Sequence, residues 1–461
     1  MNAALDESVL DSADRLGEAD REGLLRALAT AGAQIRESLV LTGEAGVTEQ
    51  LAGLRPRAVL LAADAAADDA GDALRALTGG PDAAATVVRH DGSGLPLWAG
   101  AADVLLAVAQ YPGVPTIPAL ADAAARRGMT VLGVGGSESS LEEACGRNRM
   151  PFVALPSGRH PRAALWGLLV PLLVAAGELG LLGRAGESVG PGGPGGPAGP
   201  GSLSGPGGPA GPGTLGEPGS PAGPGSLGAP GGPEGGGEPA DGSGGPDGPG
   251  GPGVAGPPRV PDSVEADLAA AADLLDLLAE RVRPTSETFV NPAKSLALDI
   301  GASLPVIWGT SAAAGSAARR LAGQLAAVAG RPAVWGTLPG AAQRLGGLLA
   351  GGGARVDDDL FRDRVDDPEP AARARLVLVR DAAEAIEVRR LAEQVVAAAA
   401  ERAVPVTEVA AEEGAGPLGR FASLVGMLDF AAAYVGLASG GEAAAGPVSG
   451  WPASSDGEGN R

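Results

Sequence analysis

Residues 187–260 constrain the fold most, because this stretch contains almost nothing that a protein core could bury. It consists mainly of Gly, Pro, Ser and Ala. G-x-y triplets at residues 190–201 resemble collagen, but the register breaks at residues 202–204 and again at Thr214. A triple helix needs long unbroken runs of such triplets. The segment therefore predicts a disordered linker with partial polyproline-II character.

This linker separates two regions that repeat the same order of elements. Residues 1–186 and 261–440 each begin with a long helix, alternate apolar strands with helices, and end with an apolar helix. Uninterrupted apolar strands between helices are typical of a parallel sheet that helices cover on both faces. We therefore expect an α/β protein with two flavodoxin-like αβα sandwich subdomains, followed by a disordered tail at residues 441–461.

Hydrophobic periodicity predicts the individual elements. Strands are expected at residues 58–62, 85–90, 103–109, 130–134, 152–155, 304–309, 333–335, 375–380 and 404–409. Helices are expected at residues 6–29, 67–77, 117–127, 141–147, 261–281, 312–328, 341–349, 383–400 and 418–437, with one more starting at Arg162 and a short one before residue 304.

The charge balance excludes several classes of partner. Acidic residues outnumber basic ones 55 to 34, which gives a formal net charge of −21. Such a chain repels nucleic acid and anionic membrane surfaces. The apolar stretch at residues 163–182 approaches the length of a membrane span. Pro171 and Glu178 interrupt it, and the α/β pattern around it favours a buried core helix.

The cysteine content and the N-terminus indicate a cytoplasmic protein. Residues 1–15 are acidic and lack the cationic start and apolar core of a signal peptide. The one cysteine, Cys145, permits no internal disulfide and is interpreted as a small core residue. The acidic run at residues 357–367 is interpreted as a solvated loop.

Two glycine-containing turns are candidate anion sites. The strand at residues 304–309 ends in Thr310 and Ser311, which open the next helix. Unpaired backbone N–H groups and the helix dipole attract an anion at such a position. The G-V-G-G-S run that ends at Ser137 follows another strand and is a second candidate. Ordinary strand-to-helix turns have the same composition, and that alternative stays open for both.

Several segments resemble one family. They are N-P-A-K at residues 291–294, P-V-I-W-G-T-S at 305–311, A-A-R-R-L-A-G-Q-L at 317–325, L-P-S-G-R-H-P-R-A-A-L at 155–165 and the F-A-S-L-V-G-M run that starts at 421. In this order they resemble the sugar isomerase (SIS) family, and within it the bifunctional phosphoglucose/phosphomannose isomerase branch.

The resemblance implies an activity and its site residues. It implies reversible conversion of glucose 6-phosphate or mannose 6-phosphate to fructose 6-phosphate, in a homodimer, without metal or other cofactor. Arg162, in the family's P-R-A-A segment, carries over as a substrate-binding residue. Asn291 and Lys294 are retained with the N-P-A-K segment. Together with Thr310, Ser311 and Ser137 they form the candidate substrate-binding set.

The sequence departs from the family where proton transfer would occur. Ala327 stands where the branch has its glutamate base, and Gln343 stands at the family's histidine. The first glycine loop has become A-A-D-A-A at residues 62–66, and the hydroxyl-rich phosphate loop has become A-Q-Y-P-G-V at 109–114. The family's C-terminal catalytic lysine has no counterpart. Loss of one positioned acid or base costs about 10²–10⁴-fold in rate.

Replacement catalytic groups are scarce. His160 and Glu287 are weak candidates, and the alternative for His160 is a loop histidine that faces solvent. His90 is interpreted as structural. Two distant histidines and one cysteine match no metal-ligand spacing.

Three functions remain open from the sequence. The first is a SIS-type protein that binds a sugar phosphate with weak or lost catalysis. The second is an active aldose–ketose isomerase that uses replacement residues. The third is a non-catalytic structural or regulatory partner of a sugar-pathway enzyme.

Overall fold

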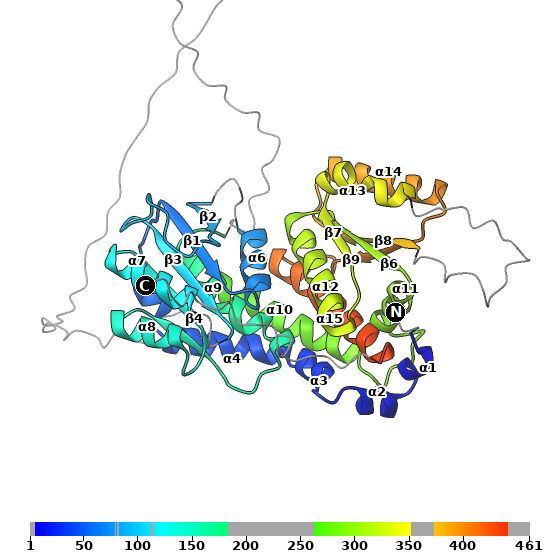
Figure 1. The fold of residues 1–461 in the computed structure, drawn as a ribbon, viewed down its shortest axis with the longest axis horizontal. Helices are drawn as coiled ribbons and strands as arrows, with labels where there is room; N and C mark the ends of the chain where they lie inside the picture. Colours follow the sequence, from blue (N-terminus) through cyan, green and yellow to red (C-terminus); the bar gives the residue numbers. More distant parts are fainter. Residues whose placement is uncertain are drawn as a thin grey trace, which may run out of the picture. The chain divides into compact units, whose positions relative to one another are not determined.

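Two parallel β-sheets, one in each region of the chain, form the framework of the fold (Figure 1). The computed structural model describes residues 5–78, 80, 83–111, 115–182, 262–351 and 373–440. The expected linker at 187–260, the tail at 441–461 and the acidic run at 357–367 lie outside the described residues.

The first sheet has the strand order β2-β1-β3-β4-β5. Its strands are β1 (Ala58–Ala63), β2 (Thr86–Arg89), β3 (Val104–Ala109), β4 (Thr130–Gly136) and β5 (Phe152–Leu155). All neighbours pair in parallel. The chain therefore adds strands first on one side of β1 and then on the other. This makes the gap between β1 and β3 a topological switch point, where ligands of α/β sheets commonly bind.

The second sheet repeats this topology with one strand fewer. Its order is β7-β6-β8-β9, again parallel throughout. The strands are β6 (Leu304–Gly309), β7 (Val334–Thr337), β8 (Ala374–Arg380) and β9 (Val406–Ala410). Its switch point lies between β6 and β8. The expected α/β class with two parallel-sheet sandwiches is confirmed.

Helices cover both faces of each sheet, because successive strand residues alternate between the faces. Leu60 and Leu105 face α7 (Thr116–Arg126) and α8 (Ser140–Asn148). Val59 and Leu61 belong to the other face. The helices on that face include α5 (Val47–Leu51), α6 (Asp68–Leu77) and α9 (Leu165–Glu178), which follows a 3₁₀ turn, η1 (Pro161–Ala163).

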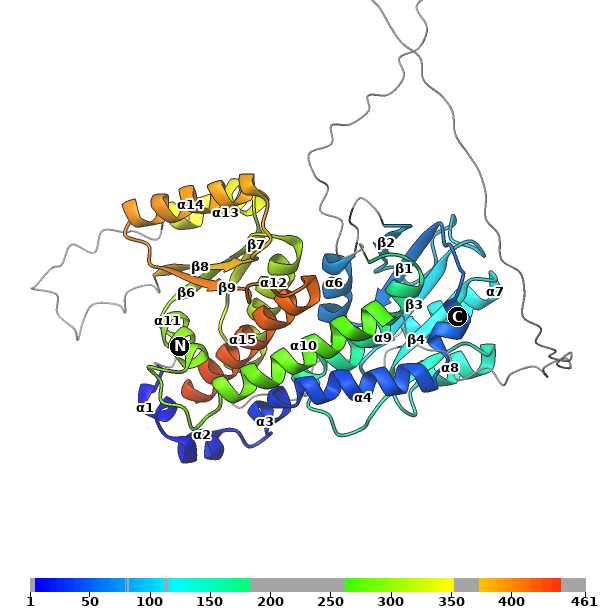
Figure 2. The same ribbon diagram turned by 180° about the vertical axis from the view of Figure 1, so that it is seen from behind.

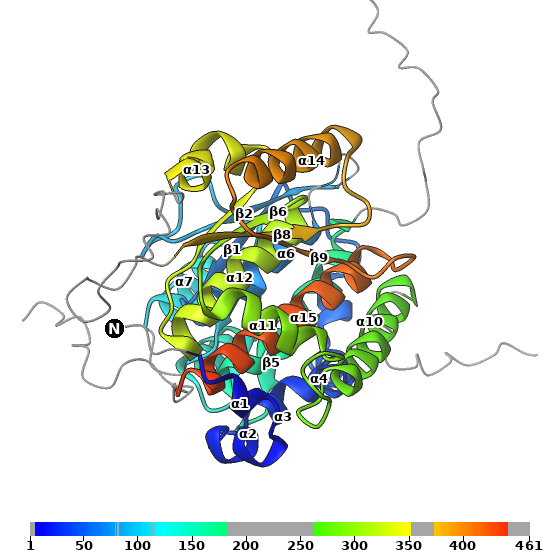
Figure 3. The same ribbon diagram turned by 90° about the vertical axis from the view of Figure 1, so that its right-hand side faces the viewer.

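The second sheet is covered in the same way. Figure 3 shows α13 (Gly340–Gly351) and α14 (Ile386–Glu401) on one face and α11 (Pro292–Gly301), α12 (Ala312–Ala329) and α15 (Pro417–Ala438) on the other. Figure 2 shows α4 (Ala31–Glu44), α10 (Asp262–Arg281) and α15 side by side. Since α4 belongs to the first region and α10 to the second, the two regions share helix contacts.

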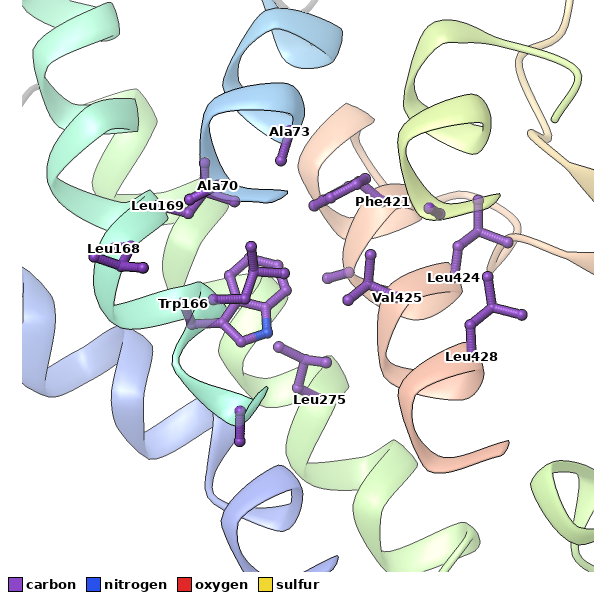
Figure 4. Packing of buried hydrophobic residues seen from close by; sticks show 14 of the residues in the cluster. Ala70, Ala73, Trp166, Leu168, Leu169, Leu275, Phe421, Leu424, Val425 and Leu428 are labelled. Carbon is purple, nitrogen blue, oxygen red and sulfur yellow. The ribbon is translucent and has the colours of Figure 1, made fainter. Parts of the chain in front are cut away.

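One apolar cluster joins the two regions. It contains Trp166 of α9, Leu275 of α10 and Phe421 of α15 (Figure 4). The rings of Trp166 and Phe421 meet edge to face, with centroids 6.2 Å apart. The described parts of both regions accordingly group into one compact unit. The domain boundaries expected from the sequence stay a prediction.

The expected single helix over residues 6–29 is wrong. The segment forms three short helices, α1 (Glu7–Leu10), α2 (Ala13–Ala19) and α3 (Leu24–Ala29). Asp6 and Ser12 cap the first two with side-chain oxygens. The Asp20 carboxylate accepts hydrogen bonds from the backbone N–H groups of Leu24 and Leu25 at 2.7 and 3.0 Å. These short polar side chains compete with the backbone for N–H groups and divide the helix, which periodicity alone did not reveal.

In the part of the chain that the structure describes, two helical windows are long and apolar enough to cross a membrane, Pro161–Glu178 and Pro417–Ala438. Of the first window 78% is buried inside the fold, and of the second 94%. The expectation that the apolar stretch after residue 163 is a core helix agrees with this burial, because core helices meet the same length and hydropathy criteria.

Candidate functional site

A cavity of about 390 Å³ lies between the start of α6, the turn η1 and the face of α12. Figure 2 shows α6 and α12 next to each other, and their residues are in contact. The polar side chains that line the cavity are Asp68, Asp69, Gln110, Arg162, Arg319, Arg320 and Gln324.

Helix α12 brings two arginines to this cavity. Its first turn lies directly on the end of β6, since a Cβ on Gly309 would come within 2.2 Å of the Gly315 nitrogen. The Ser311 hydroxyl caps the helix by accepting a hydrogen bond from the Ala314 N–H at 3.0 Å. Small residues and a capping hydroxyl therefore set the direction of α12, and with it the positions of Arg319 and Arg320.

Arg320 forms ion pairs with two carboxylates. Its Nε and Nη2 donate to Asp429 of α15, each with a contact of 2.8 Å, and its Nη1 donates to Asp69 of α6 at 2.9 Å. Burial acts to lower the pKa of Arg320, but the two carboxylates outweigh it and the pKa is raised. Arg320 therefore stays positively charged, and the carboxylates of Asp429 and Asp69 balance its charge.

Arg319 is also paired with carboxylates. It donates to Asp68, and its Nη1 lies 3.3 Å from Asp72. Its guanidinium also lies over the ring of Trp335, 5.9 Å from the centroid. Both arginines of α12 therefore pair with aspartates of α6, although Nη1 of Arg319 is buried without a hydrogen bond.

Arg162 differs from these two. Its backbone is held on both sides. The carbonyl oxygen accepts hydrogen bonds from Arg320 Nη2 at 3.0 Å and Gln324 Nε2 at 2.9 Å, and the N–H donates to His160 Nδ1 at 3.2 Å. Its guanidinium has no carboxylate partner among the described residues, and its Nε is buried without a hydrogen bond. Arg162 is therefore the cavity arginine that remains available to an anion.

A second cavity of about 240 Å³ adjoins the first and shares Gln110 and Pro161 with it. The Gln110 amide donates to the Pro161 carbonyl at 2.8 Å. Ser137, exposed after β4, and Ser157 after β5 add hydroxyl groups at the carboxyl ends of the strands. The two cavities together offer the guanidinium of Arg162, that of Arg159, which donates to Glu37, and several hydroxyl and amide groups.

His160 faces away from solvent. Its side chain is 5% exposed, with Nε2 3.5 Å from the Glu22 carboxylate. Burial lowers its pKa, while Glu22 and Asp20 act in the opposite direction. The alternative of a solvent-facing loop histidine is therefore wrong. The residue acts as a cap of η1 by accepting the Arg162 N–H, and it belongs to neither of the two cavities.

Lys294 and Asn291 hold the backbone rather than line the cavity. The Lys294 amine, on a side chain 1% exposed, donates to the carbonyls of Leu10, Pro284 and Ser286 at 2.5, 2.7 and 2.8 Å. Asn291 caps α11 by accepting the N–H of Lys294 at 3.1 Å. The structure therefore does not bring them together with Arg162.

Thr310 and Ser311 already contact a carboxylate of the chain. The Ser311 hydroxyl donates to Asp381 Oδ2 at 2.8 Å, and the Asp381 N–H donates to the Thr310 hydroxyl at 2.9 Å. Burial acts to raise the pKa of Asp381, but hydrogen bonds from Ala383, Ser311 and Arg420 outweigh it and the pKa is lowered. The expected open anion turn is thus occupied by this carboxylate.

The remaining expected positions lie elsewhere. Glu287 is exposed on a turn before α11, and Gln343 is exposed on α13. Ala327 packs on α12 against the main apolar cluster. His90 follows β2 and lines neither cavity.

Sequence reasoning missed Gln110 and Gln324. Gln110 directly follows the strand at 103–109, and the carboxyl end of a parallel strand is where ligand groups gather. That position alone was a usable signal. Gln324 lies inside a helix and shows no comparable signal in the sequence.

The acidic groups that line the larger cavity form ion pairs with its arginines. Within the described ranges, no group of three or more His, Cys, Asp or Glu residues could hold a metal ion. The carboxylates of the larger cavity, Asp68 and Asp69, are hydrogen-bonded to arginines.

The comparisons with known proteins agree with this architecture. Residues 289–448 match the family model of the bacterial phospho-glucose isomerase C-terminal SIS domain. No curated protein matches the chain. The resemblance to SIS proteins is thus confirmed for this domain, while the narrower bifunctional branch stays a prediction.

Solved structures share the fold. A hypothetical protein from Thermus thermophilus superposes with a TM-score of 0.54 and 12% identity, over 95% of this chain and 91% of that one. Tagatose-6-phosphate ketose/aldose isomerase from Escherichia coli superposes with a TM-score of 0.50 and 11% identity, over 93% and 94%. At these identities the likeness concerns the fold alone.

Proposed function

We propose that this chain binds a sugar phosphate, or a related anionic sugar derivative, in the cavity that contains Arg162, and that its own isomerase activity is weak or lost. The observation that carries the proposal is the state of the Arg162 guanidinium. It lines the cavity without a carboxylate partner among the described residues, whereas Arg319 and Arg320 are paired. A planar guanidinium suits a phosphate or carboxylate group.

The neighbouring groups support a carbohydrate ligand. Gln110 joins the two cavities, and Ser137 and Ser157 line the smaller one. Amides and hydroxyls of this kind hydrogen-bond sugar hydroxyls. The SIS match of residues 289–448 supports the same ligand class. Within this proposal residues 1–186 and 261–440 act as two SIS subdomains of a cytoplasmic homodimer that uses no cofactor.

Weak or absent catalysis follows from the proton-transfer groups. Aldose–ketose isomerisation moves a proton between C1 and C2 and needs a base in reach of that carbon. Asp68 and Asp69 are paired with arginines, and neither His160 nor Glu287 lines the cavity. Ala327 and Gln343, at the family's catalytic positions, carry no group that titrates near neutral pH.

Thermal unfolding with hexose phosphates tests the binding. A ligand that binds only the native state raises the apparent Tm. We expect glucose 6-phosphate or fructose 6-phosphate to raise Tm and unphosphorylated glucose to have no effect. Arg162→Gln should lose at least about tenfold in affinity, the scale of one charged hydrogen bond. Arg55→Gln, an exposed arginine outside the cavities, is the control for the same charge change.

Two results would contradict the proposal. If no hexose phosphate raises Tm, the chain serves instead as a partner protein without a sugar site. If purified protein converts fructose 6-phosphate faster than about 1 s⁻¹, the low end of common enzyme rates, it is a working isomerase.

A further inference from the structure

Asp64 occupies a nest of backbone N–H groups at the switch point of the first sheet. The residue follows β1 directly and is 5% exposed. Its Oδ1 accepts hydrogen bonds from the N–H groups of Ala66 and Ala67 at 3.0 and 2.8 Å, and its Oδ2 accepts one from Tyr111 at 3.1 Å. The donors come from two loops, one after β1 and one after β3, and they converge on a single carboxylate.

Asp381 occupies the equivalent place in the second sheet. It follows β8, and Oδ2 accepts a hydrogen bond from the Ser311 hydroxyl after β6 at 2.8 Å. Oδ1 accepts hydrogen bonds from the Ala383 N–H at 3.1 Å and from Arg420 Nε at 2.6 Å. Ser311 and Ala383 follow the two strands that border the switch point, and Arg420 is contributed by α15.

The two aspartates are related by topology rather than by sequence position. The order β2-β1-β3 in one sheet corresponds to β7-β6-β8 in the other. Asp64 follows β1 and contacts the loop after β3. Asp381 follows β8 and contacts the turn after β6. A carboxyl group of the chain itself therefore sits at both switch points.

We propose that Asp64 and Asp381 are built-in anions that close both strand-end nests to external phosphate, so that an anionic ligand is restricted to Arg162. A carboxylate and a phosphate need the same N–H and hydroxyl donors, and two anions within one nest repel each other. The closure of the two nests does not depend on the proposed function, because it concerns which groups an external anion can reach; only the restriction to Arg162 rests on it.

Removal of the Asp64 carboxylate would connect its nest with the larger cavity. Ala66 donates to Asp64 and also lines that cavity, and Gln110 beside it lines both cavities. The freed N–H groups of Ala66, Ala67 and Tyr111 would then face space that an oxyanion can enter. Loss of the carboxylate should therefore create phosphate binding rather than only reduce stability.

The test is the effect of inorganic phosphate on thermal unfolding at constant ionic strength. We expect Asp64→Ala to show a saturable rise in Tm of roughly 2–3 °C at a phosphate concentration ten times its Kd. Wild type and Asp14→Ala should show only the smaller rise that phosphate bound at Arg162 produces, and Arg162→Gln should remove that rise. Asp14 is exposed, and its replacement changes the net charge by the same amount without opening a nest.

A second variant at the same position covers the case in which Asp64→Ala does not fold. Asp64→Ser keeps a hydroxyl that caps the same turn but removes the charge. If Asp64→Ala does not fold, Asp64→Ser should show the phosphate effect. Asp381→Ala tests the other nest independently, since it frees Arg420 and the Ser311 hydroxyl.

Clear results would overturn the inference. Equal phosphate stabilisation of wild type, Asp14→Ala and the Asp64 and Asp381 variants would mean that the aspartates exclude nothing. Phosphate-dependent shifts of the Ala66 and Tyr111 amide signals in the wild type would mean that the nest is open. Failure of hexose phosphates to bind the wild type, with phosphate binding to Asp64→Ala, would reject the proposed function but retain this inference.

Discussion

Arg320 and Asp429 form a two-pronged ion pair in which both side chains are 7% exposed. The pair joins α12 to α15, and the third arm of the guanidinium reaches Asp69 on α6. The same residue donates to the backbone carbonyl of Arg162. One buried side chain therefore links the helices of both regions to the turn that presents the free arginine of the site.

Replacement of Arg320 by Gln should destabilise the protein strongly. The change leaves the Asp429 carboxylate buried without its partner, which costs about 3–5 kcal/mol in comparable pairs. The double variant Arg320→Met/Asp429→Leu should recover much of this loss, because no buried charge remains. Urea unfolding midpoints measure both effects.

A solvent-exposed pair provides the control. Arg36 bonds Asp273 and Asp276 on the surface, and Arg36→Gln should leave the midpoint nearly unchanged. If Arg320→Gln behaves like Arg36→Gln, the buried pair does not hold the helices together.

Lys294→Met should lower stability without changing affinity for a hexose phosphate. Three carbonyl oxygens lose their shared donor, and a buried unsatisfied polar group costs about 1–3 kcal/mol. Calorimetric titration of the folded variant measures affinity, and urea unfolding measures stability. Arg126→Met, an exposed cation on α7, is the control. A selective loss of ligand affinity would instead assign Lys294 to the binding site.

Stability should fall below pH 6.5 in part because of His160. Burial lowers its pKa in the folded protein, so the unfolded chain takes up the proton first as the pH falls. The neutral side chain therefore contributes stability above the unfolded pKa of about 6.5, and this contribution is lost toward the folded pKa. His160→Gln should flatten the pH dependence of Tm between pH 5 and 7. An unchanged profile would contradict this.

Cys145 should resist thiol reagents in the folded protein. Its side chain is fully buried on α8, and burial raises its pKa to about 12. The reactive thiolate is therefore scarce at pH 8. We expect modification by a disulfide reagent only after denaturant is added. Rapid labelling of the native protein would show that α8 opens easily.

The regular elements were predictable because their signals are local. The strand at residues 304–309 and the following turn were identified from apolar run length and small residues, and β6 with α12 occupies these positions. The N-terminal helices were missed for the opposite reason. Asp6, Ser12 and Asp20 compete for backbone N–H groups, and average periodicity does not register that competition.

The sequence by itself determined the α/β class, the repeated strand–helix order and the presence of Arg162, because periodicity and residue identity need no knowledge of distant contacts. Only the tertiary structure decided which side chains are free to meet a ligand. Lys294 bonds a carbonyl 284 positions away, and Ser311 bonds an aspartate 70 positions away. Such partners are chosen by packing, and a hydrogen bond already made inside the protein removes a group from the binding chemistry that its residue type suggests.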